Sequence, residues 1–204
     1  MAQTSTTLSG ARSHEGNITG TDISFTTTSG VNTIKSTSTT LTGSGKLAVR
    51  DLVTVTGTSL NNATFTVKAV VSATEFTVEE IVKAEEADNS TTTTLDHSGF
   101  VTDKAKGDGY YSQPDGVHTV AYQVVNRGDS VDDFNGTIKM QGSLAITPTE
   151  DDWFDISGTT FTSDLSTTIA SYNFTGNFVW VRAKVETTNA TSNRALVTSI
   201  LLNN

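Results

Sequence analysis

The chain has 204 residues, of which 35% are hydrophobic, and a formal net charge of -9 from 22 acidic and 13 basic residues. This negative charge repels a nucleic-acid backbone and an anionic membrane surface, so we expect neither as a partner. The absence of cysteine excludes disulfides and thiolate metal sites. Threonine is abundant, and because its β-branched side chain suits a pleated strand, the composition favours an all-β fold.

Residues 1–20 are rich in Ser, Thr and Gly without apolar periodicity, which predicts an extended N-terminal arm. A polar arm is ordered only when something holds it, and we expect a neighbouring chain to do so rather than the body of the fold. The residues expected to make these assembly contacts are Gln3, Leu8, Arg12 and Ile18. The start lacks the basic and apolar blocks of a signal peptide, so we expect synthesis in a cytoplasm without Sec-type export.

Residues 21–88 are predicted to form a small β domain. Apolar residues alternate with threonine in several short segments, which indicates half-buried strands. The clearest alternating positions are Val53, Val55, Phe65, Val67, Phe76 and Val78. Turn residues separate these segments at short intervals, so the pattern predicts a small antiparallel β-barrel or compact sandwich.

The Ser/Thr-rich interval 89–98 is predicted to be a connector, followed by a second domain over 99–204. Longer alternating segments there include Val120, Tyr122 and Val124. The segment 178–185 is apolar on both faces at its start, as in a central strand, and this pattern places Trp180 in the core. These features predict a jelly-roll-like antiparallel β-sandwich.

Two stretches resemble virion proteins of tailed bacteriophages, especially those of marine cyanobacteria. The stretch 48–67 has an acidic residue before alternating valines, an Asn-rich turn and a returning Thr-Phe-Thr-Val strand. The second domain is similar to phage domains that combine Gly-Thr-Ile, Gln-Gly-Ser, an Asp-Asp-Trp corner and Trp-Val-Arg-Ala, here beginning at positions 136, 141, 151 and 180. Such proteins are capsid decorations, neck or collar parts, or tail and fibre components, and the resemblance implies a homo-oligomer.

The sequence offers little for catalysis. None of His14, His97 and His118 lies at metal-ligand spacing to another histidine or in a nucleophile motif, so we expect them in surface or turn positions. Acidic clusters occur at 129–133 and 150–155, and we interpret them as solvated turn acids, with a calcium site or a glycosidase pair as alternatives. We therefore expect no enzymatic activity, cofactor or resident metal.

Three aromatic residues lie in loop-like contexts. Tyr110 and Tyr111 follow Gly-Asp-Gly, and Trp153 follows the acidic corner. We favour core or interface packing for these residues. Because exposed rings are what a β-sandwich uses to bind sugars, a glycan-binding platform is the alternative.

We expect a non-enzymatic structural protein of a phage particle, located in the virion. A capsid decoration or cement protein, or a neck or tail accessory component, fits this expectation. It would act through contacts with other copies of itself and other virion proteins. The alternative is a carbohydrate- or receptor-binding module of a tail or fibre that recognises a host surface glycan.

Overall fold

The computed structural model describes residues 5–13, 16–112, 116–126, 133–187 and 197–203. Within them the fold is all-β and antiparallel, with only two short 3-10 helices, which confirms the predicted fold class. No helix in the described part of the chain is both long and apolar enough to cross a membrane. The chain divides into two compact units, called unit 1 and unit 2, and each is described by itself.

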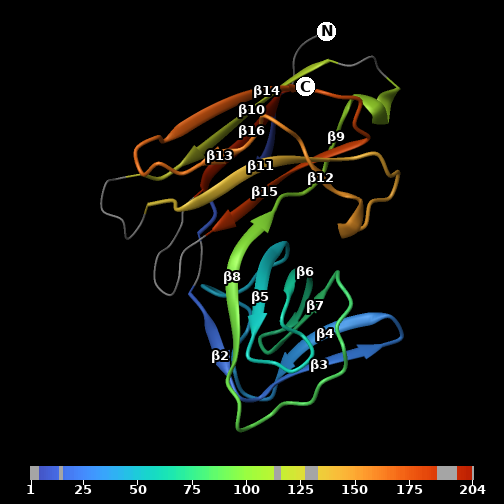
Figure 1. The fold of residues 1–204 in the computed structure, drawn as a ribbon, viewed down its shortest axis with the longest axis vertical. Helices are drawn as coiled ribbons and strands as arrows, with labels where there is room; N and C mark the ends of the chain where they lie inside the picture. The colour runs from blue at the N-terminus through green and yellow to red at the C-terminus, as the bar shows by residue number, and fades with distance from the viewer. Residues whose placement is uncertain (1–4, 14–15, 113–115, 127–132, 188–196, 204) are drawn as a thin grey trace. The chain divides into compact units, whose positions relative to one another are not determined.

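Unit 1 contains most of the second half of the sequence together with the N-terminal strand (Figure 1). Its first sheet has the strand order β1-β16-β10-β14. The strands are β1 (Ser5–Ser9), β16 (Val197–Asn203), β10 (Val117–Val124) and β14 (Ile169–Thr175). Alternate residues of β10 and β16 are buried because side chains alternate between the two faces of a strand.

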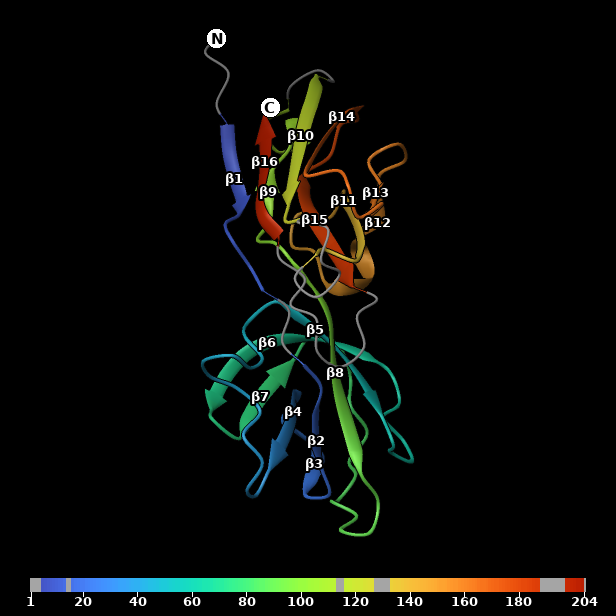
Figure 2. The ribbon, with the colours of Figure 1, turned by 90° about the vertical axis from the view of Figure 1, so that its left-hand side faces the viewer.

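The second sheet of unit 1 is built around two long strands, β11 (Gly136–Ser143) and β15 (Trp180–Thr187). Short strands extend it: β9 (Ala105–Lys106), β12 (Phe154–Asp155) and β13 (Phe161–Thr162). The 3-10 helix η1 (Asp108–Tyr111) connects β9 to β10 of the first sheet, and η2 (Glu150–Asp152) lies between β11 and β12. Figures 1 and 2 show the two sheets as separate layers, and buried residues of β10, β11, β15 and β16 fill the core of this β-sandwich.

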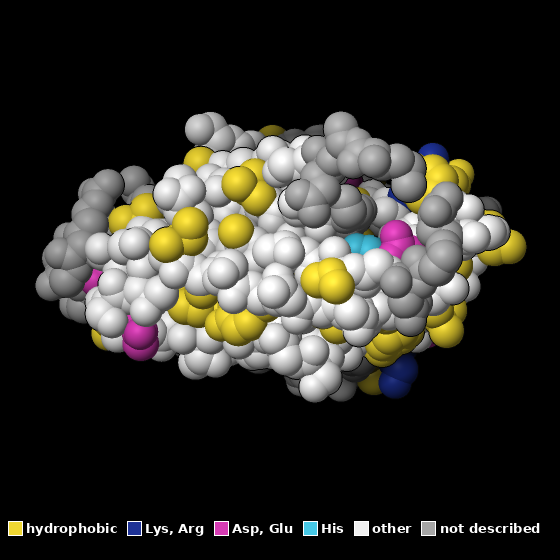
Figure 3. All heavy atoms as spheres, turned by 90° about the horizontal axis from the view of Figure 1, so that it is seen from above, with side chains coloured by type: hydrophobic (Ala, Val, Ile, Leu, Met, Phe, Trp, Pro, Cys, Tyr) yellow, Lys and Arg dark blue, Asp and Glu magenta, His cyan; other side chains and the backbone are white. Residues whose placement is uncertain are grey.

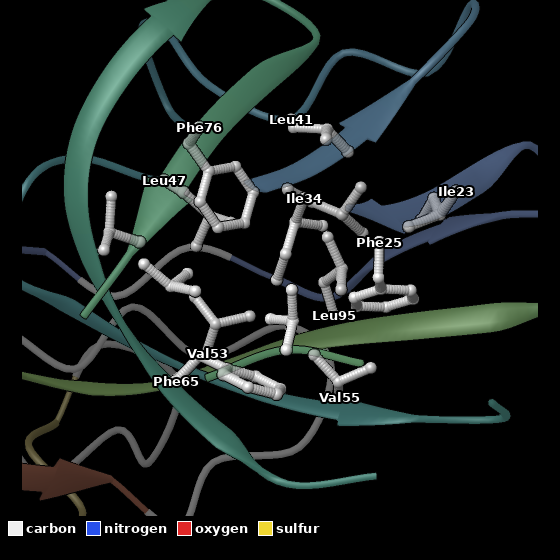
Figure 4. Close-up of a cluster of buried hydrophobic side chains, with 14 residues drawn as sticks. Ile23, Phe25, Ile34, Leu41, Leu47, Val53, Val55, Phe65, Phe76 and Leu95 are labelled. Atoms are coloured by element: carbon white, nitrogen blue, oxygen red, sulfur yellow. The ribbon is translucent and has the colours of Figure 1, made fainter. Parts of the chain in front are cut away.

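Unit 2 contains the strand order β8-β5-β6-β7-β4-β3, with β2 paired to β8. The strands are β2 (Ile18–Gly20), β3 (Ile23–Thr28), β4 (Val31–Ser36), β5 (Asp51–Thr56), β6 (Thr64–Ser72), β7 (Glu75–Val78) and β8 (Thr93–Val101). Their apolar side chains converge on one core, as Figure 4 shows. The strands do not close into a barrel within the described residues, so this unit is an open, compact antiparallel fold.

The interval 89–98, predicted as a connector, is largely strand. Residues from Thr93 onward form β8, and Leu95 is completely buried in the core of unit 2. The sequence pattern does not indicate this strand, because Leu95 is the only strongly apolar residue between residue 89 and Phe100. Pairing with β5 along six positions supplies the order that local composition does not.

Asp22 organises the start of unit 2 through its carboxylate. Ser36 and Thr39 donate side-chain hydrogen bonds to it at 2.6 and 2.7 Å, and the Ser38 backbone N–H donates at 2.7 Å. Thr37 adds a hydroxyl donor at 3.0 Å. These donors, those of Ser36 and Thr39 foremost, outweigh partial burial and hold the pKa of Asp22 well below its ordinary value.

Replacing Asp22 with asparagine should destabilise unit 2 by roughly 1–2 kcal/mol at neutral pH, because the charged acceptor is lost. Since the folded pKa is lowered, the contribution of Asp22 is present above its unfolded pKa, about 4, and is lost as the pH falls below that value. Urea unfolding between pH 7 and pH 3 should therefore show a difference between the two proteins that shrinks below about pH 4. A pH-independent difference would contradict this role for the carboxylate.

Candidate functional site

Tyr110 and Tyr111 end the short helix η1 in unit 1, and a close backbone approach positions them. The N–H of Gly109 donates to the carbonyl of Phe178 at 2.8 Å. A Cβ atom at position 109 would lie 2.9 Å from the Phe178 carbonyl carbon, so a residue without a side chain is needed there. The Gly-Asp-Gly sequence thus brings both tyrosines against the start of β15.

The rings of the two tyrosines and of Trp180 form a continuous group. The ring centroids are 5.2 Å apart for Tyr110 and Tyr111, and 4.9 Å apart for Tyr110 and Trp180. The indole N–H of Trp180 donates to the Ile146 carbonyl at 2.9 Å, which ties the loop after β11 to the same place. We call Tyr110, Tyr111, Leu144, Ile146 and Trp180 the aromatic patch.

The aromatic patch is exposed to an unusual degree for such large side chains. Ile146 is 83% exposed, Leu144 64% and Tyr111 58%, whereas Trp180 is half-buried. Single exposed apolar residues are normal on a protein surface, whereas three rings in contact beside a loop with two exposed aliphatic residues are a candidate interaction site.

Arg182 lies next to the aromatic patch on the outer face of β15, two residues after Trp180. Its guanidinium makes a bidentate ion pair with Glu150 at 2.9 and 2.6 Å. Its Nε donates to Gln141 Oε1 at 3.0 Å, and the Trp153 ring lies over it at 4.2 Å. Because Arg182 is only 4% exposed, this paired charge holds Trp153 in a fixed position rather than offering a free cation.

Two lysines border the aromatic patch. Lys104 Nζ lies 4.3 Å from the Trp180 ring centroid, and Lys106 Nζ lies 4.1 Å from that of Tyr110. Both side chains belong to exposed residues, so the patch has an apolar centre and a basic margin. Protein-binding sites commonly combine apolar residues at the centre with polar residues at the rim.

The structure brings together part of the predicted glycan platform. Tyr110 and Tyr111 are exposed and adjacent, as a platform requires. Trp153 is only half-exposed, and its ring is engaged by Arg182. Trp180, predicted to lie in the core, is half-buried and belongs to the group of rings. The alternation of β15 could have indicated otherwise, because Trp180 shares a strand face with Arg182 and Lys184.

The predicted assembly arm is divided between the two units. Leu8 lies in β1, which pairs with β16 of the same chain, and Arg12 makes two backbone hydrogen bonds with Val197. Ile18 is buried in the core of unit 2. Gln3 lies outside the described residues. Residues 5–12 thus contact the body of their own chain, and contacts of these residues with a neighbouring chain stay a prediction.

The expectation of surface or turn histidines is wrong for His97 and His118. His97 is 3% exposed, and its Nε2 lies 3.3 Å from Asp51 Oδ1. His118 is 1% exposed, with Nε2 3.3 Å from Asp108 Oδ2 and its ring stacked on a phenylalanine. Both sit on inward faces of strands, where a partner distant in sequence makes burial tolerable. His14 lies outside the described residues.

Three acidic residues of the segment 150–155, namely Glu150, Asp152 and Asp155, are engaged by separate partners. Glu150 binds Arg182, and Asp152 accepts hydrogen bonds from the backbone and hydroxyl of Thr149. Asp155 contacts Lys139 Nζ at 2.8 Å. Burial alone would raise the pKa of Asp155, but hydrogen bonds from Lys139 and Gln141 lower it by more. No set of three or more metal-ligating side chains converges within the described ranges.

The other predicted acidic cluster lies mostly outside the described residues. Asp129 and Asp132 belong to that part of the chain, whereas Asp133 is described and buried at 1% exposure. The interpretation of the cluster as solvated turn acids is therefore wrong for Asp133.

Comparison of the chain with protein-family models, curated proteins and solved structures finds no match.

Proposed function

We propose that the protein is a non-enzymatic structural component of a bacteriophage particle that acts through protein–protein contacts. A capsid decoration protein or a neck or tail accessory component would have this role. The observation that carries the proposal is the exposed aromatic patch of unit 1, because Tyr, Trp and large apolar side chains are enriched where protein surfaces bind each other.

The composition of the patch favours a protein partner over other ligands. Leu144 and Ile146 are more exposed than either tyrosine, and aliphatic side chains gain most from an apolar partner surface. The nearest buried cation, Arg182, is neutralised by Glu150, so binding there does not require a charged ligand. The rigid rings lose little conformational entropy when they are covered.

The assignment to a phage particle is supported by the sequence motifs. The stretch 48–67 forms the β5–β6 hairpin in unit 2, and the Gly-Thr-Ile and Trp-Val-Arg-Ala motifs begin the paired strands β11 and β15. These motifs thus occupy paired strands in both units. A scaffold resemblance of this kind favours a structural role.

The burial of the two histidines within the described residues, His97 and His118, supports a non-enzymatic role. A catalytic residue must touch its substrate, but the His97 and His118 imidazoles are both at most 3% exposed. Their acidic partners, Asp51 and Asp108, position these rings within each unit's own fold.

Mass spectrometry of purified particles tests the proposal. The protein should be present in stoichiometric amounts, and its absence from the particle would contradict the assignment.

A double variant, Tyr111→Ser with Ile146→Ser, should bind particles that lack the protein about tenfold or more weakly than the original chain, since each exposed anchor contributes on the order of 1 kcal/mol. Ile81→Ser is the matched control, because Ile81 is equally exposed but belongs to unit 2.

Carbohydrate binding is the second candidate, and the exposed ring of Tyr111 beside Tyr110 is the observation that favours it. Gln141 and Glu150 lie near the patch but are already hydrogen-bonded to Arg182. A glycan array with the original chain and the Tyr111→Ser variant distinguishes the candidates. Binding that the variant loses would favour the glycan, and a silent array would exclude it for the sugars tested.

A further inference from the structure

The sheet β1-β16-β10-β14 of unit 1 ends in an uncovered strand. Within the described residues, β14 (Ile169–Thr175) pairs only with β10, over seven consecutive positions and without a register shift. It contains no proline and no charged residue. An edge strand of this length exposes a row of unpaired backbone donors and acceptors, which is a template for pairing with another strand.

Other edges in the molecule carry the protection that β14 lacks. The opposite edge of the same sheet, β1, has only five residues and a register shift between Thr7 and Ser9. In unit 2, the edge strand β3 is covered in part by two backbone hydrogen bonds between Phe25 and Glu85. Short length, irregularity and a covering segment are devices that prevent pairing between edges.

The direction of the free backbone groups follows from one hydrogen bond. The N–H of Val124 donates to the carbonyl of Thr168, so the backbone of Thr168 faces β10. In an antiparallel sheet alternate residues face the same neighbour, and the N–H and C=O groups of Ile169, Ser171, Asn173 and Thr175 therefore point to the free edge. The side chains of these four residues are exposed, so they are not packed against other parts of the chain in a way that would block a partner strand.

The charge distribution of the sheet favours a second copy of this acidic chain as the partner. None of the four strands contains Asp, Glu, Lys or Arg, although the chain carries a net charge of -9. Figure 3 looks down from above Figure 1, where this sheet lies uppermost, and shows mostly uncharged and hydrophobic side chains across the centre of the view. Two copies can meet at such a surface without bringing like charges together.

We propose that β14 pairs with β14 of a second copy, antiparallel and related by a two-fold axis. The pairing joins the two four-stranded sheets into one continuous sheet and satisfies the free backbone groups of both edges. It deepens the proposed function, because it assigns a site to the expected homo-oligomer, and it uses a surface separate from the aromatic patch.

Variants at Ser171 test this pairing, because no side-chain hydrogen bond of Ser171 has to be broken. Ser171→Pro removes a backbone N–H that faces the free edge and leaves the bonds to β10 in place. Ser171→Lys keeps that N–H but places a positive charge on the edge, and the same charge on both copies opposes their pairing. Ser171→Ala is the matched control, since it removes the hydroxyl but keeps the N–H.

Sedimentation velocity over a concentration series measures the outcome. The original chain and Ser171→Ala should reach twice the 21.6 kDa chain mass, and the proline and lysine variants should raise the dimer dissociation constant at least about tenfold. Circular dichroism establishes that each variant is folded. A monomeric original chain, or folded Pro and Lys variants that dimerise as well as it does, would overturn the proposal. Because the purified chain is used, failure here is distinct from absence of the protein from particles.

Discussion

Replacing Phe76 with alanine is expected to lower the free energy of unfolding of unit 2 by about 3–5 kcal/mol. Phe76 is completely buried on β7, and Figure 4 shows its ring directed into the core beside Leu47. Truncation removes apolar contacts and leaves a cavity that strands on several sides prevent from collapsing. Hydrogen exchange of peptides from β4, β6 and β7, read by mass spectrometry, measures the loss of protection.

Val71→Ala is the matched control for Phe76→Ala. Val71 lies on β6, the strand that pairs with β7, but it is 57% exposed. Its truncation should change the stability by no more than about 0.5 kcal/mol. Equal effects of the two substitutions would mean that the core of unit 2 is not packed around Phe76.

Replacing Glu150 with glutamine is expected to destabilise unit 1 by about 3 kcal/mol, because it leaves the buried guanidinium of Arg182 without its counter-charge. The Trp153 ring rests on that guanidinium. Both tryptophans of the chain belong to unit 1, so their fluorescence during urea unfolding reports this unit. The exposed neighbour Asp151 provides the control, and Asp151→Asn should cost less than about 0.5 kcal/mol.

A double-mutant cycle separates the ion pair from other effects. Adding Arg182→Met to Glu150→Gln removes the unpaired charge, so the double variant should be less destabilised than the sum of the single variants by about 1 kcal/mol or more. Additive effects would show that the two side chains stabilise unit 1 independently, and would contradict their role in holding Trp153.

The sequence predicts much of the fold because strand periodicity is a local property. The alternation of Phe65 with Val67 and of Phe76 with Val78 places these residues in the core of unit 2, where the structure has them. The loop context of Tyr110 and Tyr111 leaves exposed rings and packed rings as alternatives, and the structure has both rings exposed. In both cases the signal lies within a few residues of the position that it describes.

The predictions that fail depend on partners distant in sequence. His97 and His118 are buried because Asp51 and Asp108 lie beside them in space, and no local pattern reveals such pairs. The valines on either side of Trp180 predict a core position, although Trp180 shares its strand face with Arg182. Pairing with β16, which begins almost two hundred residues later in the chain, holds the arm strand β1 in the same way.

A photo-reactive residue at position 111 tests most directly whether the aromatic patch binds a protein of the particle. After irradiation of purified particles, mass spectrometry identifies the peptides joined to that position, with the same residue at position 81 in unit 2 as the control. We predict that position 111 cross-links to a virion protein or a second copy much more efficiently than position 81 does. Particles in which position 111 forms no cross-link to protein while position 81 does would contradict the account.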